Sequence, residues 1–201
     1  MPRVDFLGTG NAFSPHGRMH ALALIDGDIL IDAPPTVITQ LKRSGYSSGQ
    51  IRHLLFTHWH GDHIFGFPFM MLERKYVTNR EMKVGLDIYL RPGGKEILSG
   101  LCETGFPGSL ESLDTMVNWN EDEDGDVGDT DWKFNRFPVN HNPETDPHGY
   151  ELIHSSGFRM LHCGDSGPCP EIDRRAPKAD VIVVEMGVPD IGDFPHHHRP
   201  S

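Results

Sequence analysis

The heptapeptide Thr57-His58-Trp59-His60-Gly61-Asp62-His63 decides the fold that the sequence predicts. It holds three histidines and one aspartate within six residues, and it follows the apolar, β-prone residues 51–57. Histidine is the commonest metal ligand in proteins and changes charge near neutral pH. A loop of surface histidines is the alternative interpretation. The density of ligand side chains directly after an apolar strand favours a metal site instead.

The spacing within this heptapeptide suits two metal ions. Gly61 permits a sharp turn, because glycine adopts backbone conformations that other residues avoid. His58 and His60 are alternate residues and can point to one ion, while the turn directs Asp62 and His63 to a second. Imidazole and carboxylate groups suit zinc, and also manganese or iron. Two such ions about 4 Å apart can share a bridging hydroxide, which is a nucleophile at neutral pH.

Short strands with interspersed helices surround the heptapeptide. The predicted strands cover residues 4–7, 21–25, 29–31, 51–57, 86–90, 133–139, 150–154, 158–161 and 181–184. A first predicted helix opens at Pro34 and stops at Gly45, and two more cover residues 65–73 and 94–101. This order predicts a single α+β domain over residues 1–201, with mixed sheets and helices packed outside them.

The stretch 120–131 is rich in acidic residues and glycine. A solvated turn is the favoured interpretation. A calcium loop fits less well, because Val127 and Lys133 stand where the EF-hand pattern requires glycine and glutamate. An acidic tail that binds a partner is weaker still, since strand signals follow at once.

Composition narrows the setting in which the chain works. A formal net charge of −11 gives nucleic acid no broad electrostatic attraction, although bound dications would reverse the sign locally. Three cysteines without a CxxC pair argue against a disulfide scaffold. Because no apolar leader follows Met1 and no run approaches membrane-spanning length, we expect a cytoplasmic protein without a membrane partner.

The order of motifs along the chain resembles the metallo-β-lactamase superfamily. The heptapeptide matches its His-x-His-x-Asp-His signature. The branch that contains tRNase Z, bacterial cyclic phosphodiesterases and arylsulfatases is similar in further stretches, which are Leu7-Gly8-Thr9-Gly10, Ile29-Leu30-Ile31-Asp32, His63-Ile64-Phe65-Gly66, Phe137-Pro138-Val139-Asn140-His141, His148-Gly149-Tyr150 and Cys163-Gly164-Asp165-Ser166.

The resemblance implies an αβ/βα sandwich of two mixed sheets flanked by helices. It also implies a binuclear metal site. The first ion would take His58, His60, His141 and Asp165, and the second Asp62, His63 and Asp165. Asp32 would orient a ligand histidine through a hydrogen bond. His148, His162 and Cys163 are interpreted as core or supporting residues.

The carboxyl-terminal end departs from the family pattern. Residues 196–201 resemble the branch's late histidine element, and His198 or His197 would protonate the leaving oxygen. A polar histidine tail is the alternative. The family continues through a helix and a strand to a last metal ligand, whereas this chain stops at Ser201, so the last strand and helix elements are expected to be missing. His196 or His197 could take that ligand's place.

Three functions follow from this reasoning. The first is a phosphodiesterase-type hydrolase that uses a hydroxide bridging two metal ions, oriented by Asp62, on a nucleotide, a small phosphodiester or RNA. A tRNA-processing nuclease is its sharpest form, but residues 74–80 are the only local basic cluster. The second is a lactone or thioester hydrolase with the same metals. The third is a metal-binding module without turnover. A homodimer is compatible with each.

Overall fold

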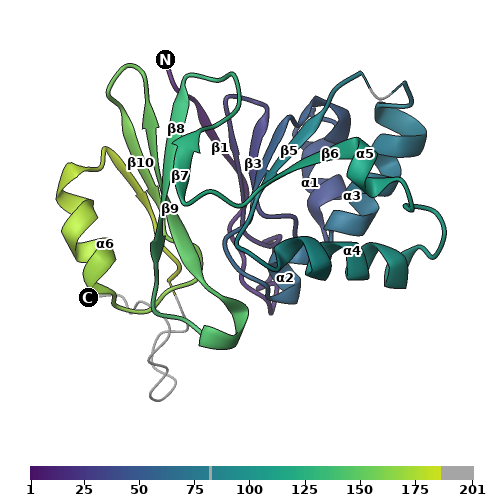
Figure 1. Ribbon diagram of the computed structural model, residues 1–201. Helices are drawn as coiled ribbons and strands as arrows, with labels where there is room; N and C mark the ends of the chain where they lie inside the picture. Colours follow the sequence, from purple (N-terminus) through teal and green to yellow (C-terminus); the bar gives the residue numbers. More distant parts are fainter. Residues whose placement is uncertain (82, 187–201) are drawn as a thin grey trace. The chain divides into compact units, whose positions relative to one another are not determined.

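Figure 1 shows the computed structural model, which describes residues 1–81 and 83–186. The chain divides into two compact units. The first unit is Pro2–Asp122, and the second contains the described residues from Glu123 onward together with Met1. Each unit has one β-sheet of its own, so the two sets of candidate ligands lie on two separate sheets.

The first unit is built on a six-stranded mixed sheet with the order β1-β2-β3-β4-β5-β6. Its strands are β1 (Val4–Gly8), β2 (Leu22–Ile25), β3 (Ile29–Ile31), β4 (His53–Leu55), β5 (Leu86–Tyr89) and β6 (Val117–Asn120). β1, β2 and β3 pair antiparallel, and β3 to β6 pair parallel. The antiparallel hairpin therefore leads directly into the parallel half that carries the heptapeptide.

Helices of the first unit cover one face of this sheet, where α1, α3, α4 and α5 lie (Figure 1). The helices are α1 (Val37–Arg43), α2 (Gly61–Ile64), α3 (Phe67–Glu73), α4 (Gly94–Gly105) and α5 (Leu113–Met116), with short helical turns at Ser48–Gln50 and Arg74–Thr78. Leu30 and Leu54 of the strands share one buried apolar cluster with Leu41, Phe67 and Leu98 of the helices. Burial of this apolar surface is the main force that holds helices to sheet.

The helix expected over residues 65–73 is confirmed as α3, which begins two residues later at Phe67, and the separate short helix α2 ends just before it at Ile64. The backbone of Gly66 approaches that of Pro34 so closely that a Cβ atom would lie 1.9 Å from the Pro34 carbonyl oxygen. Its N–H donates to the carbonyl of Ala33 at 2.8 Å. Pro68 then lies in the first turn of α3, where its missing N–H costs no helical hydrogen bond.

The second unit is built on a five-stranded sheet with the order β11-β10-β9-β8-β7. Its strands are β7 (Asp124–Asp126), β8 (Trp132–Pro138), β9 (His148–His154), β10 (Arg159–His162) and β11 (Val181–Val183). β7 to β10 pair antiparallel, while β10 and β11 pair parallel. Both sheets are thus mixed, as expected.

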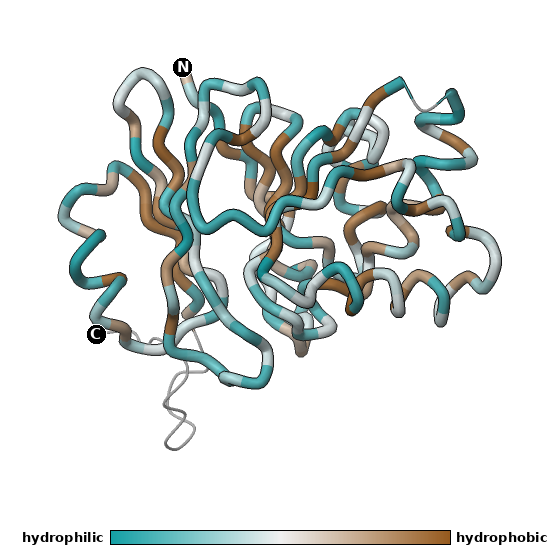
Figure 2. Tube along the Cα trace, in the orientation of Figure 1, coloured by the Kyte–Doolittle hydropathy of each residue, from teal (hydrophilic) through white to brown (hydrophobic). Residues whose placement is uncertain are grey.

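One helix, α6 (Pro170–Arg175), flanks the second sheet (Figure 1). Its buried Ile172 packs in a small apolar cluster with Phe137, Leu161 and Cys163. β2 and β3 of the first unit are hydrophobic along their length, whereas α6 is mostly hydrophilic outside this contact (Figure 2). α6 is therefore amphipathic and covers the sheet with one face only.

Most of the predicted strands are confirmed within one or two residues, but the stretch 51–57 forms a strand only over His53–Leu55. The interpretation of 120–131 as a turn is wrong in part, because Asp124–Asp126 pair with β8 as an exposed edge strand. β6 and α6 were not predicted. No helix within the described residues has both the length and the apolar character needed to cross a bilayer.

Candidate metal centre

The sheet of the first unit brings the start of the candidate site together. β3 and β4 run parallel, so the residues that follow them emerge at the same edge. Asp32 follows β3, and Thr57 and His58 follow β4 closely. Asp32 has a positive φ of 67°, a conformation that aspartate tolerates better than most residues. This turn keeps its carboxylate beside the neighbouring loop.

Asp32 is a buried carboxylate that holds two parts of the heptapeptide. Its Oδ1 accepts the backbone N–H of Thr57 at 2.8 Å, and its Oδ2 accepts the Thr57 hydroxyl at 2.8 Å. Nδ1 of His63 lies 2.8 Å from the same Oδ2. The side chain is 3% exposed, so these partners replace water around its charge. The expectation that Asp32 contacts a candidate ligand histidine is confirmed.

These hydrogen bonds determine where His58 carries its proton. The Thr57 hydroxyl has one hydrogen, which it donates to Asp32. Nδ1 of His58 lies 3.1 Å from that hydroxyl oxygen, which can then only accept. His58 is therefore protonated on Nδ1 and presents the lone pair of Nε2. A metal ligand needs such a lone pair.

His63 is oriented in the same way. Its Nδ1–H donates to Asp32, which leaves the lone pair on Nε2. Nε2 lies 3.5 Å from Oδ2 of Asp62, and the rings of His58 and His63 are 4.1 Å apart. One buried carboxylate thus fixes two imidazoles, through a hydroxyl in one case and directly in the other.

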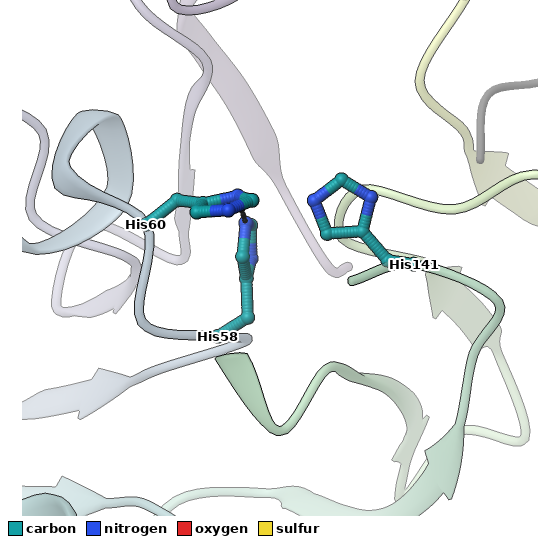
Figure 3. Close-up of side chains that lie close together, drawn as sticks. All are labelled: His58, His60 and His141. Carbon is teal, nitrogen blue, oxygen red and sulfur yellow. Dashed lines mark hydrogen bonds between the residues drawn. The ribbon is translucent and has the colours of Figure 1, made fainter. Parts of the chain in front are cut away.

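His60 completes the cluster of the first unit. Its Nδ1 lies 3.1 Å from Nε2 of His58 (Figure 3). His60 directly precedes α2, and the turn at Gly61 that the sequence predicts is the first turn of that helix. The four candidate ligands of the heptapeptide therefore form one compact group of nitrogen and carboxylate donors, which fits a divalent ion such as zinc.

The second unit places its two candidate ligands on neighbouring loops. His141, which Figure 3 also labels, follows β8, and Asp165 follows β10. Both strands are antiparallel to β9, so their carboxyl ends lie at one edge. Asn140 N–H donates to the Ser166 hydroxyl at 3.2 Å, and Gly167 N–H donates to the Asn140 carbonyl at 2.8 Å. These bonds join the loop of His141 to the loop of Asp165.

The other histidines and the cysteine named in the motifs contact neighbouring groups of the second unit. His148 is 4% exposed, with Nδ1 3.3 Å from the Asp146 carbonyl and Nε2 3.4 Å from the Tyr150 hydroxyl. His162 Nδ1 accepts the Gly164 N–H at 3.3 Å. Burial raises the pKa of the Cys163 thiol to about 12. His196, His197 and His198 lie outside the described residues.

Sequence reasoning missed the hydroxyl groups of this region. Thr57 belongs to the quoted heptapeptide, yet no role was predicted for it. Its position directly before the first histidine is the signal that could have found it. Ser166 next to Asp165 was quoted as part of a motif but not as a link between loops.

Solved structures with this fold define its class. The metallo-β-lactamase-fold protein YhfI from Bacillus subtilis superposes with a TM-score of 0.75, covering 98% of this chain and 78% of that one at 18% identity. The short form of human tRNase Z superposes with a TM-score of 0.73, covering 100% and 85% at 21% identity. The chain therefore has the metallo-β-lactamase fold.

Sequence comparisons agree and give the family. Ribonuclease Z of Methanothermobacter thermautotrophicus is 32% identical over 145 residues, and that of Mycolicibacterium gilvum is 27% identical over 204 residues. These alignments cover 70% and 91% of this chain, but 45% and 68% of the relatives' own lengths. The family described as Anti-Pycsar protein Apyc1 matches residues 2–187, and the chain belongs to it.

Proposed function

We propose that the chain is a metal-dependent hydrolase of phosphodiester bonds, with one metal centre that takes ligands from both units. The cluster of His58, His60 and His63 in the first unit supports this proposal, and the family resemblance adds His141 and Asp165 of the second unit to it. Asp62 belongs to the same cluster through its contact with His63. The observation that carries the proposal is that Nδ1 of His63 contacts Asp32 and Nδ1 of His58 contacts the Thr57 hydroxyl, an arrangement that favours a lone pair on both Nε2 atoms.

The chemistry assigns different tasks to these side chains. Two divalent ions, which we take to be zinc, would supply an activated water and polarise the phosphoryl oxygen when bound. The carboxylate of Asp62 lies beside His63, with Oδ2 3.5 Å from Nε2, and its side chain is 15% exposed. It can accept a proton from an attacking water and orient it. His198 remains the proposed donor of a proton to the leaving oxygen.

Small phosphodiesters and nucleotides suit this chain better than tRNA. Residues 74–80 are the basic cluster that the sequence offers, but Arg74 is 1% exposed and donates to backbone carbonyls. Lys75 donates to the Ser109 carbonyl at 2.8 Å. These charges hold the first unit together, which leaves fewer of them for contacts with phosphates of a long RNA.

The proposal is tested by metal content and hydrolysis measured on the same preparation. We expect two zinc equivalents per chain and turnover of bis(p-nitrophenyl) phosphate and of nucleotide phosphodiesters. His60→Ala should lose metal and turnover, while His154→Ala, at the opposite end of β9 from His148, should retain both. Exclusive turnover of lactones or thioesters would establish the alternative hydrolase. Metal binding without any turnover would establish the inactive module.

Other features of the proposal concern the whole protein. A single domain over residues 1–201, a cytoplasmic location and a homodimer are parts of it that need separate measurements. Sedimentation of the intact chain gives the oligomeric state directly. A monomer that retains full turnover would remove the homodimer from the proposal.

A further inference from the structure

The connection between β1 and β2 is an exposed loop with an aromatic tip. Residues 12–18 are all exposed, and Phe13 is 85% exposed. Its ring is in water, where an apolar surface has an unfavourable free energy. A single exposed phenylalanine is ordinary on a protein surface. This loop differs from an ordinary surface loop because hydrogen bonds hold its backbone in place.

The neck of the loop is closed by backbone hydrogen bonds. Gly10 N–H donates to the Met19 carbonyl at 2.7 Å, and Ala21 N–H donates to the Gly10 carbonyl at 2.7 Å. At Gly8 the two sides approach so closely that a Cβ atom would lie 2.1 Å from the His20 carbonyl oxygen. The glycines of the Leu7-Gly8-Thr9-Gly10 stretch therefore permit this closure.

A chain of side-chain hydrogen bonds fixes the loop to the start of α1. Thr36 donates its hydroxyl hydrogen to Gln40 Oε1 at 2.8 Å, so the Thr36 oxygen accepts from Nδ1–H of His20 at 3.1 Å. Nε2 of His20 then accepts the hydroxyl of Ser14 at 3.1 Å. Gln40 Nε2 donates to the His20 carbonyl at 2.8 Å and closes the circuit. Each group has a defined role as donor or acceptor.

The tip next to Phe13 is held in an uncommon conformation. Ser14 has a positive φ of 45°, a conformation that non-glycine residues seldom adopt. The side chain of Asn11 accepts the Phe13 N–H at 3.1 Å, and its carbonyl accepts the Ser14 N–H at 2.9 Å. The structure therefore presents the exposed ring from a fixed backbone.

This loop emerges at the edge of the sheet that carries the candidate ligands. β1 and β3 are both antiparallel to β2 and so point the same way, as does β4. The loop after β1 thus lies at the same edge as Asp32 and the heptapeptide. His20 forms a hydrogen bond with Thr36. Three residues before Thr36, the N–H of Ala33 donates to the His63 carbonyl at 2.7 Å, so the segment that anchors the loop also contacts the heptapeptide.

We propose that Phe13 is a substrate-recognition residue that stacks on the planar base of a nucleotide phosphodiester, with His20 as the positioning residue of its loop. This inference rests on the proposed function and adds to it the part of the substrate away from the phosphorus. The flat face of a base is apolar. When it stacks on an aromatic ring, the face of the base and the face of the ring that touch are both removed from water. Such stacking is tolerant of base identity, so Phe13 selects nucleotides over simple esters rather than one base over another.

The test compares an ester with a base and one without. Thymidine 5′-(p-nitrophenyl phosphate) and methyl p-nitrophenyl phosphate release the same product at the same kind of bond. In Phe13→Ala the ratio of kcat/KM for the thymidine ester to that for the methyl ester should fall roughly tenfold. His20→Phe, which removes the hydrogen bonds at this ring, should lower the same ratio by a smaller factor. Phe69→Ala, at a phenylalanine on α3 that is 56% exposed, should leave it unchanged.

A binding measurement keeps this inference separate from the proposed function. Calorimetric titration with thymidine 5′-monophosphate and with inorganic phosphate needs no turnover. The wild type should bind the nucleotide more tightly than phosphate, and Phe13→Ala should lose roughly tenfold of that preference. Equal preference in the two proteins would overturn the role of Phe13, whatever the hydrolytic results. An unchanged preference combined with an altered sedimentation coefficient would make Phe13 a self-association residue and would also overturn it.

Discussion

Nδ1 of His63 lies 2.8 Å from Oδ2 of Asp32, although the two residues are 31 positions apart in the chain. Both side chains are almost fully buried, with 5% and 3% exposure. The same oxygen accepts the Thr57 hydroxyl that in turn bonds to His58. One carboxylate therefore orients two histidines. A change at Asp32 should alter the metal affinity of both.

Replacing Asp32 should weaken metal binding without removing any candidate ligand. Asp32→Asn keeps the tolerance for positive φ. Its amide nitrogen cannot accept a hydrogen bond, so the variant cannot keep all the hydrogen bonds that the two carboxylate oxygens accept from Thr57 and His63. Loss of such supporting contacts costs about 10- to 100-fold in metal affinity. Competition with a chelating dye measures the affinity. Wild-type zinc affinity in Asp32→Asn would show that the orientation of His63 does not depend on this carboxylate.

The Thr57 hydroxyl makes a separate prediction. Thr57→Val preserves shape but leaves Asp32 Oδ2 and His58 Nδ1 without this buried partner. We expect a loss of about 1–3 kcal/mol in unfolding free energy. Zinc affinity should fall as well, because His58 can then adopt the other tautomer. Thr57→Ser retains the hydroxyl and should restore zinc affinity. Urea unfolding of the zinc-free protein separates the stability effect from the metal effect.

The candidate site was predictable where its signal is local. His58, His60, Asp62 and His63 lie within six residues, so their spacing alone indicates ligand geometry. The bond between Asn140 and Ser166 joins two loops 26 positions apart, and spacing does not encode such a contact. Assigning Asp165 and His141 to the same metal centre is a proposal that rests on the family resemblance.

The same division explains the fold prediction. β3 and β4 are apolar and β-branched or leucine-rich, so their patterns are strong. β6 and β7 have the sequences Val-Asn-Trp-Asn and Asp-Gly-Asp, which are typical of loops. They are strands because a neighbouring strand supplies hydrogen-bond partners, which is a tertiary effect. The break between α2 and α3 follows from the contact of Gly66 with Pro34, also a tertiary effect.

Arg74 should be essential for the stability of the first unit. Its guanidinium donates to the carbonyls of Ser48, Ile51, Val84 and Gly85 from a position that is 1% exposed. Lysine cannot reproduce this planar fork, so Arg74→Lys would leave buried carbonyls unsatisfied. The expected loss is about 3 kcal/mol in unfolding free energy. Arg80→Lys, at an exposed arginine, is the matched control, and equal losses in both variants would contradict this role.

Cys102 should make stability depend on alkaline pH. Burial raises the pKa of its thiol to about 12, above its ordinary value near 8.5. The folded state keeps the proton as pH rises through 9 while the unfolded chain releases it. The contribution is thus fully present below the ordinary pKa and is lost between about pH 9 and 12. Between pH 8 and 10 the wild type should lose more stability than Cys102→Ala, measured by urea unfolding. Parallel losses would contradict burial of this thiol.

The carboxylate of Glu151 should stabilise the second unit by joining α6 to its sheet. Oε1 lies 3.1 Å from Nη1 of Arg159 on β10, and Oε2 lies 3.3 Å from Nη1 of Arg175 on α6. The Glu151 and Arg175 side chains are 14% and 13% exposed, so solvent screens this pair less than a surface pair.

Glu151→Gln keeps one acceptor and removes the charge, which should cost about 1–3 kcal/mol. Glu171→Gln removes a more exposed carboxylate that also contacts Arg175 and should cost much less, because exposed pairs contribute little. Hydrogen exchange of α6 amides should increase in the first variant and not in the second. If both variants exchanged alike, the packing of Ile172 rather than Glu151 would hold the helix.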